Sequence, residues 1–177
     1  MTFIQEKIQL TCQNLSQRIA VRTQRIEEMA MLRVPYKTAN TPPDGDWARY
    51  CGGPIDFARD SHAWFVFTAD VPETGEDEAV WLRFTTGREG QWDAQNPQGT
   101  VFIDGDTAVQ ALDTNHTEVR VPSGRHEIRI YFYGGTSAAT LTLNAALVTK
   151  RVSVEKLYWD LFVPLCAMKS LPRGSYA

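Results

Sequence analysis

Cysteine is scarce in this sequence, and its number and spacing argue against a disulfide framework. The 177 residues contain three cysteines, Cys12, Cys51 and Cys166, which lie far apart and form no CxxC pair. An odd number of widely spaced cysteines favours reduced thiols. The N-terminus also lacks the basic start and apolar run of a secretory signal, so we expect a cytoplasmic protein.

Long apolar runs and an excess of positive charge are missing as well. No stretch approaches the ~18 consecutive apolar residues that span a bilayer, and the formal net charge is −3 without any basic run. These absences argue against a membrane partner and against a nucleic-acid partner. The apolar fraction of 43% is ordinary for a soluble globular protein. A chain of this length buries about 70% of its unfolded surface, which is enough for a core.

The first third of the chain consists of two segments of different composition. Residues 1–33 are expected to form a helical segment, one long helix or two short ones, because residues 3 to about 30 contain no glycine or proline. Its apolar stripe is Ile4, Ile8, Leu15, Ile19 and Ile26. Residues 34–62 are rich in proline and glycine, which predicts an irregular approach anchored by the aromatic rings of Trp47, Tyr50 and Phe57.

Residues 63–149 carry the pattern of a β-sandwich. Short runs rich in Val, Ile, Thr and aromatic residues alternate with polar punctuation. The runs are AWFVFTADV, AVWLRFTT, TVFID, TAVQAL, TEVRVP, HEIRIYFY and ATLTLNAALV. Seven or eight strands without crossover helices predict a mainly β fold, an antiparallel jelly-roll or galactose-binding-like sandwich with helices flanking it at both termini. Asp104-Gly105 predicts a hairpin.

Residues 150–177 are expected to form a C-terminal helix followed by a truncated end. The residues that share one helical face are Val154, Leu157, Tyr158, Leu161, Leu165 and Met168. Pro164 should kink this helix or end it near Phe162. The apolar stripes of both terminal helices must be covered. The two helices could pack on each other, on the sandwich or on a partner that is absent from this chain.

The segment Thr85–Gln98 is too long and too charged for a simple connection between strands, since hairpin loops usually have ~2–5 residues. Its candidate sugar-contact or interface residues are Arg88, Glu89, Trp92, Asp93 and Asn96. The alternative is a loop that folds on itself, with Trp92 as its own core and Arg88 paired to Glu89 or Asp93.

Catalytic motifs are not found. His62 is interpreted as structural, whereas Asp113 and His116 are secondary candidates for an acid–base or metal pair on a turn. Neither an HExxH nor a GxSxG motif occurs. Trp64 and Trp81 lie within strand patterns and are expected in the core. Apart from the secondary candidate pair of Asp113 and His116, the sequence predicts no catalytic residue and no metal ligand.

Residues 45 to about 165 resemble the N-terminal region of bacterial α-mannosidases of glycoside hydrolase family 38. The resemblance is carried by residues 62–65 (HAWF), 86–90 (TGREG), 92–94 (WDA), 96–98 (NPQ), 101–105 (VFIDG), 112–119 (LDTNHTEV) and 154–161 (VEKLYWDL). It implies a non-catalytic accessory domain that supports a catalytic barrel of the same polypeptide. The parent would be a retaining hydrolase of α-linked mannose, with zinc held in that barrel.

The resemblance transfers no active-site residue to this chain. His62-Ala63-Trp64 is not the zinc-binding pattern of the family, so we expect no cofactor here and no catalysis by these 177 residues. The expected partners are the catalytic domain, a glycan or a second copy of the chain. Two alternatives stay open: a stand-alone carbohydrate-binding module, or an adaptor that oligomerises through its helical stripes. In the accessory-domain interpretation, the Thr85–Gln98 loop would contact the catalytic domain.

Overall fold

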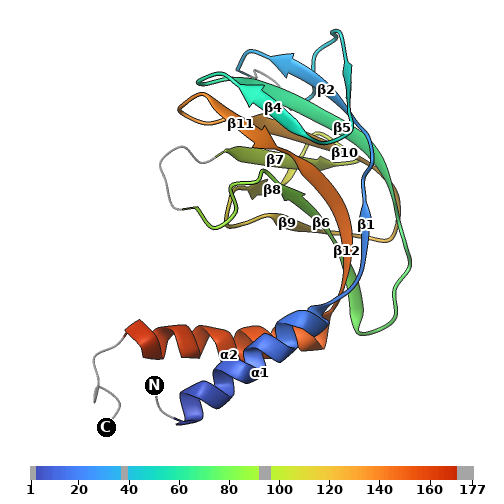
Figure 1. Ribbon diagram of the computed structural model, residues 1–177. Coiled ribbons are helices and arrows are strands. Elements are labelled where there is room, and N and C mark those ends of the chain that lie inside the picture. Colours follow the sequence, from blue (N-terminus) through green and yellow to red (C-terminus); the bar gives the residue numbers. More distant parts are fainter. Residues whose placement is uncertain (1–2, 37–39, 92–96, 171–177) are drawn as a thin grey trace. The chain divides into compact units, whose positions relative to one another are not determined.

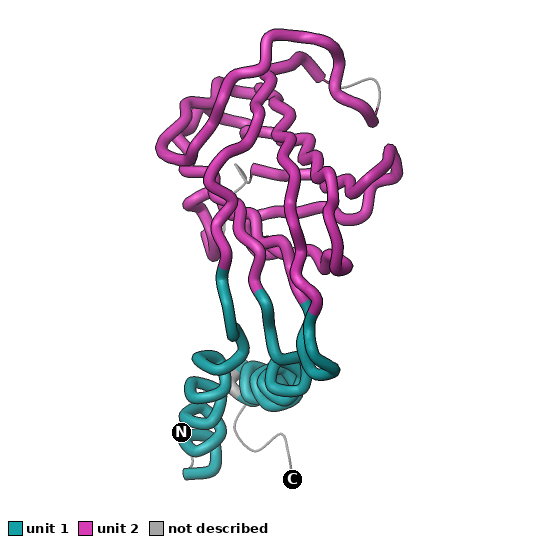
Figure 2. Tube along the Cα trace, turned by 90° about the vertical axis from the view of Figure 1, so that its right-hand side faces the viewer, with its two compact units in different colours: residues 1–23, 74–79, 149–177 teal, residues 24–73, 80–148 magenta. Residues whose placement is uncertain are grey.

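The computed structural model describes residues 3–36, 40–91 and 97–170, which form two α-helices and twelve β-strands (Figure 1). In chain order the elements are α1 (Phe3–Ile19), β1 (Ala20–Arg25), β2 (Met29–Val34), β3 (Ala48–Tyr50), β4 (Pro54–Phe57), β5 (His62–Val71), β6 (Glu78–Thr85), β7 (Gln98–Ile103), β8 (Ala108–Leu112), β9 (Glu118–Val121), β10 (Gly124–Tyr133), β11 (Ala139–Thr142), β12 (Asn144–Arg151) and α2 (Val152–Ser170). The chain divides into two compact units (Figure 2). The smaller unit consists of residues 1–23, 74–79 and 149–177, and the larger unit consists of residues 24–73 and 80–148.

The strands form two large sheets and one small one. Their orders are β1-β12-β6-β9, β3-β2-β5-β10-β7-β8 and β11-β4. The pairs of the six-stranded sheet are antiparallel, with β10 between β5 and β7. This arrangement confirms the mainly β, antiparallel sandwich with flanking terminal helices.

The core of the larger unit is packed between the two large sheets. Phe65 of β5, Phe84 of β6 and Phe132 of β10 are at most 2% exposed, and their ring centroids lie 5.9–6.0 Å apart. Successive side chains of a strand point to opposite faces. On each of these strands, the residues next to the phenylalanine therefore face away from the core.

A second apolar cluster covers part of that other face of the six-stranded sheet. It consists of Leu32, Trp64, Phe102 and Tyr131, each at most 7% exposed. Trp64 is fully buried, as expected from the sequence. Trp81 is only half-buried, and the guanidinium of Arg120 lies 5.9 Å from its ring centroid. The prediction of a core position therefore holds for Trp64 and only partly for Trp81.

The strand predictions from residue 63 onward agree with the structure. Each of the seven runs forms a strand, and ATLTLNAALV divides into β11 and β12. Asp104-Gly105 joins β7 to its antiparallel partner β8, and Asp104 has a φ of 52°. Asp is among the residues that adopt this left-handed conformation most readily.

The prediction of helix up to about residue 30 is wrong beyond Ile19. Ala20–Arg25 and Met29–Val34 are strands, neighbouring β12 and β5 respectively. Two short strands, Ala48–Tyr50 and Pro54–Phe57, also lie in the segment expected to be irregular. Pairing with distant strands overrides a local composition that only weakly favours helix.

In the smaller unit, α1 and α2 pack on each other. Cys12 of α1 and Leu165 of α2 are buried, 4% and 2% exposed. The helix α2 continues through Pro164 to Ser170, so the expectation that it ends near Phe162 is wrong. Proline removes one backbone donor, and the packing of α2 on α1 offsets that loss. Within the described ranges, neither helix is long and apolar enough to cross a membrane.

The start of α2 is fixed by the loop between β5 and β6. One carboxylate oxygen of Asp77 accepts a hydrogen bond from the backbone N–H of Ser153 over 2.9 Å, and the other accepts one from its hydroxyl over 2.6 Å. The first N–H groups of a helix have no partner within the helix. Asp77 therefore caps α2 from a distant part of the chain.

Candidate functional site

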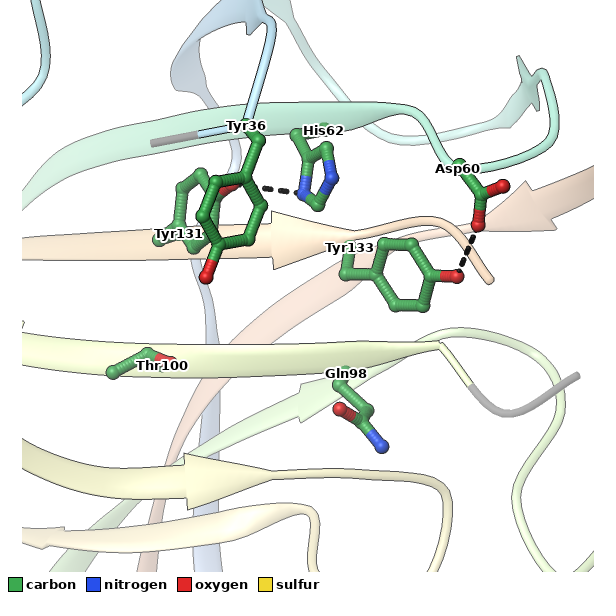
Figure 3. A pocket seen from close by; sticks show the side chains of 7 residues that line it. All are labelled: Tyr36, Asp60, His62, Gln98, Thr100, Tyr131 and Tyr133. Carbon is green, nitrogen blue, oxygen red and sulfur yellow. Dashed lines mark hydrogen bonds between the residues drawn. The ribbon is translucent and has the colours of Figure 1, made fainter. Parts of the chain in front are cut away.

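A cleft of about 580 Å³ lies in the larger unit, on the face of the six-stranded sheet that points away from the core. Its lining is rich in tyrosine (Figure 3). The seven lining residues are Tyr36, Asp60, His62, Gln98, Thr100, Tyr131 and Tyr133. A concave site with aromatic walls and a few polar groups is the usual form of a small-ligand site.

The strand register brings most of this lining together. Tyr133 of β10 is the cross-strand neighbour of His62 on β5 and of Gln98 on β7. Tyr131, two residues earlier, is the neighbour of Thr100. Because side chains alternate along a strand, these five residues share one face.

His62 is surrounded by aromatic rings. It stacks on Tyr131 with a centroid distance of 5.3 Å and an interplanar angle of 8°, and Tyr36 meets it edge-on at 5.5 Å. The Tyr133 ring lies 5.0 Å away at 32°. The hydroxyl of Tyr131 lies 2.9 Å from Nδ1 of His62. These contacts fix the orientation of the imidazole, and Tyr36 is the most exposed of the three tyrosines, at 75%.

Asp60 reaches the cleft from the turn before β5. Its Oδ1 accepts a hydrogen bond from the hydroxyl of Tyr133 over 2.7 Å, and its Oδ2 lies 3.1 Å from Nε of Arg59. Its backbone N–H donates to the carbonyl of Gly135 over 3.0 Å. With a φ of 54°, Asp60 adopts the left-handed conformation. Non-glycine residues in this conformation are uncommon and are often found at functional sites.

The charge states of the cleft follow from these contacts. The hydrogen bond from Tyr133 lowers the pKa of Asp60 below 3.8, and the same bond raises the pKa of Tyr133 above 10.0. Burial lowers the pKa of His62 below 6.5, although Asp60 opposes this effect. At neutral pH the cleft therefore holds the Asp60 carboxylate, the neutral imidazole of His62 and the protonated phenol of Tyr133.

The loop singled out from the sequence is described only up to Gln91 and again from Pro97. Glu89 accepts hydrogen bonds from the backbone N–H of Thr86 and Gly87. Arg88 donates to Oε1 of Gln91 over 3.2 Å and is not paired with Glu89. The described part of the loop is therefore held by contacts within itself and by two backbone hydrogen bonds to other segments, from the N–H of Gly90 to the carbonyl of Thr114 and from the N–H of Thr142 to the carbonyl of Thr86. The other candidates, Trp92, Asp93 and Asn96, lie outside the described residues.

Asp113 and His116 do meet, as the sequence suggested, on the turn between β8 and β9. Nδ1 of His116 lies 3.1 Å from Oδ1 of Asp113, which also accepts the backbone N–H groups of Asn115 and His116 over 2.7 Å each. Burial raises the pKa of Asp113, and the backbone donors outweigh it and lower the pKa below 3.8. Neither residue lines the cleft. Their contacts are those of a capped turn.

Sequence reasoning did not find the cleft. His62 was interpreted as structural, and Tyr36, Asp60 and the strand tyrosines were not singled out. One signal was present: in the run Tyr131-Phe132-Tyr133, two-residue alternation puts both tyrosines opposite the core phenylalanine. Within residues 3–36, 40–91 and 97–170, no group of three metal-ligating side chains gathers.

Solved structures of low sequence identity are similar to this chain, among them two carbohydrate-binding modules. No family model matches the chain, and no curated protein matches it. A family 61 carbohydrate-binding module, TmCBM61, solved in complex with β-1,4-galactotriose, has a TM-score of 0.35 and 10% identity, covering 77% of this chain and 93% of that one. A family 35 carbohydrate-binding module from an environmental isolate has a TM-score of 0.34 and 11% identity, covering 74% and 90%.

Proposed function

We propose that the cleft on the six-stranded sheet binds a carbohydrate. The observation that carries this proposal is the combination of aromatic rings and hydrogen-bonding groups on a sheet face that points away from the core. It corresponds to the carbohydrate-binding alternative considered from the sequence, with the site moved from the Thr85–Gln98 loop to the cleft.

The aromatic rings supply surfaces on which a sugar can stack. The C–H groups of a pyranose face are weakly positive and suit the negative face of an aromatic ring. Tyr36 and Tyr133 are accessible enough to offer such faces, whereas Tyr131 is 7% exposed and mainly supports His62. We therefore assign stacking to Tyr36 and Tyr133 and a positioning role to Tyr131.

The polar lining supplies partners for sugar hydroxyl groups. The Asp60 carboxylate is an acceptor, the Gln98 amide is both donor and acceptor, and the hydroxyl of Thr100 can act in either role. Gln98 and Thr100 lie on the same strand, two positions apart and on the same face. A hydroxyl-rich ligand over these residues would satisfy groups that water otherwise hydrates.

A glycan array followed by calorimetric titration tests the proposal. We expect at least one glycan to bind saturably, and Tyr36→Ala to weaken its binding about tenfold, as truncation of an aromatic anchor commonly does. Trp159→Ala is the matched control, because Trp159 is an exposed aromatic residue of α2, far from the cleft in sequence and not part of its lining. Absence of saturable binding on the array, or equal losses in both variants, would contradict the proposal.

A second candidate function is that of a non-catalytic domain of an α-mannosidase, docked on a catalytic domain. It is favoured by the apolar side chains that α1 and α2 expose. These are Phe3, Ile4, Leu10, Val152, Leu157, Trp159 and Val163, each at least 40% exposed. Large exposed apolar surface often marks an interface with another protein or domain.

The reading frame after codon 177 tests this second candidate. A zinc-binding barrel encoded there, with hydrolysis of α-mannosides by the whole polypeptide, would support it. A stop codon would contradict docking on a domain of the same chain. Self-association of these 177 residues, lost when Leu157 and Val163 are changed to serine, would instead support the adaptor alternative.

A further inference from the structure

We infer that the cleft selects neutral, hydroxyl-rich sugars over sugars that carry a carboxylate, and that Asp60 sets this preference. The inference rests on the proposed function, because it names the class of glycan that the same cleft would take. It begins from the charges that face the cleft.

The charge in the lining is negative. Of the seven lining side chains, only Asp60 carries a full charge at neutral pH, since burial keeps His62 neutral and none of the seven is lysine or arginine. The guanidinium of Arg59 is close to the Asp60 carboxylate, with Nε 3.1 Å from Oδ2, but Arg59 does not line the cleft and is 76% exposed. The described lining therefore offers a ligand carboxylate no positively charged partner.

The hydrogen-bonding capacity of Asp60 points to the same ligand class. An ionised carboxylate accepts hydrogen bonds at about four lone-pair sites and donates none. Tyr133 and Arg59 each donate to one of its oxygens, which leaves capacity for donors from a ligand. Sugar hydroxyl groups are such donors. A ligand carboxylate is not, and at about 4 Å its repulsion from Asp60 would weaken binding about fivefold even at the dielectric constant of water.

The carboxylate of Asp60 is also held in place. The Asp60 N–H is bonded to the carbonyl of Gly135, and the N–H of Gly134 is bonded to the carbonyl of Ser61 over 2.9 Å. These two bonds tie the turn to the end of β10, and the Tyr133 hydroxyl fixes the side chain itself. Because the backbone is fixed, the carboxylate cannot turn away from an acidic ligand without losing the hydrogen bond from Tyr133.

The experiment uses a matched pair of ligands. The first is the neutral oligosaccharide that binds best on the array, and the second is its counterpart with a carboxylate in place of the C6 hydroxymethyl group. Calorimetry should show the acidic ligand binding at least about fivefold more weakly to the wild-type chain. Asp60→Asn keeps an acceptor for the Tyr133 hydroxyl and removes the charge, so the ratio of the two affinities should fall toward one.

Asp70→Asn is the matched control. Asp70 lies at the other end of β5 from His62, roughly 27 Å away at about 3.4 Å per residue, and it is 72% exposed beside Arg125. Its replacement changes the net charge of the chain by the same amount, yet it should leave the ratio of affinities unchanged. An equal effect of both substitutions would overturn the role of Asp60.

A salt titration of the wild-type chain tests the preference without any substitution. Salt screens exposed charges over roughly 10 Å at 0.1 M, so added salt should improve binding of the acidic ligand and leave the neutral ligand unaffected. Equal or tighter binding of the acidic ligand would overturn the inference while the proposed function stands. If neither ligand binds, the proposed function fails and the inference fails with it.

Discussion

The phenol hydroxyl of Tyr133 donates a 2.7 Å hydrogen bond to Oδ1 of Asp60, a residue 73 positions earlier in the chain. This bond joins the last residue of β10 to the turn that precedes β5 and places a carboxylate beside an aromatic ring at the rim of the cleft. Because the Asp60 carboxylate accepts this hydrogen bond from the phenol, each of the two side chains holds the other in position.

Replacing Tyr133 by phenylalanine should separate these two contributions. Tyr133→Phe keeps the ring and removes the hydrogen bond that lowers the pKa of Asp60, so this pKa should rise toward 3.8. Carbon-detected NMR of the Asp60 carboxyl group measures the change. Glycan binding should weaken less in Tyr133→Phe than in Tyr133→Ala, because phenylalanine still offers a ring. An unchanged pKa would show that the hydrogen bond is not formed in solution.

His62 and His126 should affect stability with opposite dependence on pH. Burial lowers the pKa of His62 below 6.5, whereas the hydrogen bond with Asp104 raises that of His126 above 6.5. Below pH 6.5 the unfolded chain takes up the His62 proton before the folded chain does, so stability falls as the pH falls toward the folded pKa. His126 instead contributes stability below pH 6.5 that is lost as the pH rises through its raised pKa.

Urea unfolding at about pH 5.5 and about pH 8 measures both effects. The destabilisation caused by His62→Gln should be smaller at the lower pH, and that caused by His126→Gln should be larger there. The titratable groups around His62 that could alter this result are Asp60 and the three tyrosines. The same pH trend in both variants would contradict the assigned environments.

Gly134 lies where the backbone passes close to the buried ring of Phe57. A Cβ at this position would come within 2.7 Å of Cβ and Cδ1 of Phe57, which is 1% exposed. Gly134→Ala should therefore destabilise the chain by about 1–3 kcal/mol through overpacking. Gly75→Ala is the control, because a Cβ at Gly75 meets nothing within 4 Å. Equal midpoints of chemical unfolding for the two variants would disprove the close contact.

Glu89 and Arg88 should differ in their effects on the turn that follows β6. Glu89→Ala removes the acceptor for two backbone N–H groups, those of Thr86 and Gly87, and should cost about 1–2 kcal/mol of stability. Arg88→Ala removes one hydrogen bond between exposed side chains and should cost less than about 0.5 kcal/mol. Thermal unfolding of both variants measures the two losses of stability. A larger loss for Arg88→Ala than for Glu89→Ala would show that Arg88, not Glu89, stabilises this turn.

The sandwich could be predicted because its signal is local. Two-residue alternation and turn residues such as Asp104-Gly105 act within a few positions, and they identified every strand from residue 63 onward. The strands Ala20–Arg25 and Met29–Val34 were missed because their composition does not oppose a helix, and only their pairing with β12 and β5 makes them extended. The distant partners decided the conformation.

The cleft could not be predicted for the same reason. Its lining comes from the segment after β2, the turn before β5, and the strands β5, β7 and β10, which meet only through the sheet register. The sequence drew attention to the Thr85–Gln98 loop, where polar and aromatic residues are neighbours along the chain. The alternation of Tyr131 and Tyr133 around Phe132 was the one local sign that this sheet face is not an ordinary polar surface.

Mapping a bound glycan by NMR tests the central claim most directly. The isotope-labelled chain would be titrated with the best ligand from the array, and amide shifts would be followed residue by residue. We expect saturable shifts centred on Tyr36, His62, Gln98 and Tyr133, with little change at residues 86–91. Shifts confined to residues 86–91, or no saturable shift at any glycan concentration, would contradict a carbohydrate site in the cleft.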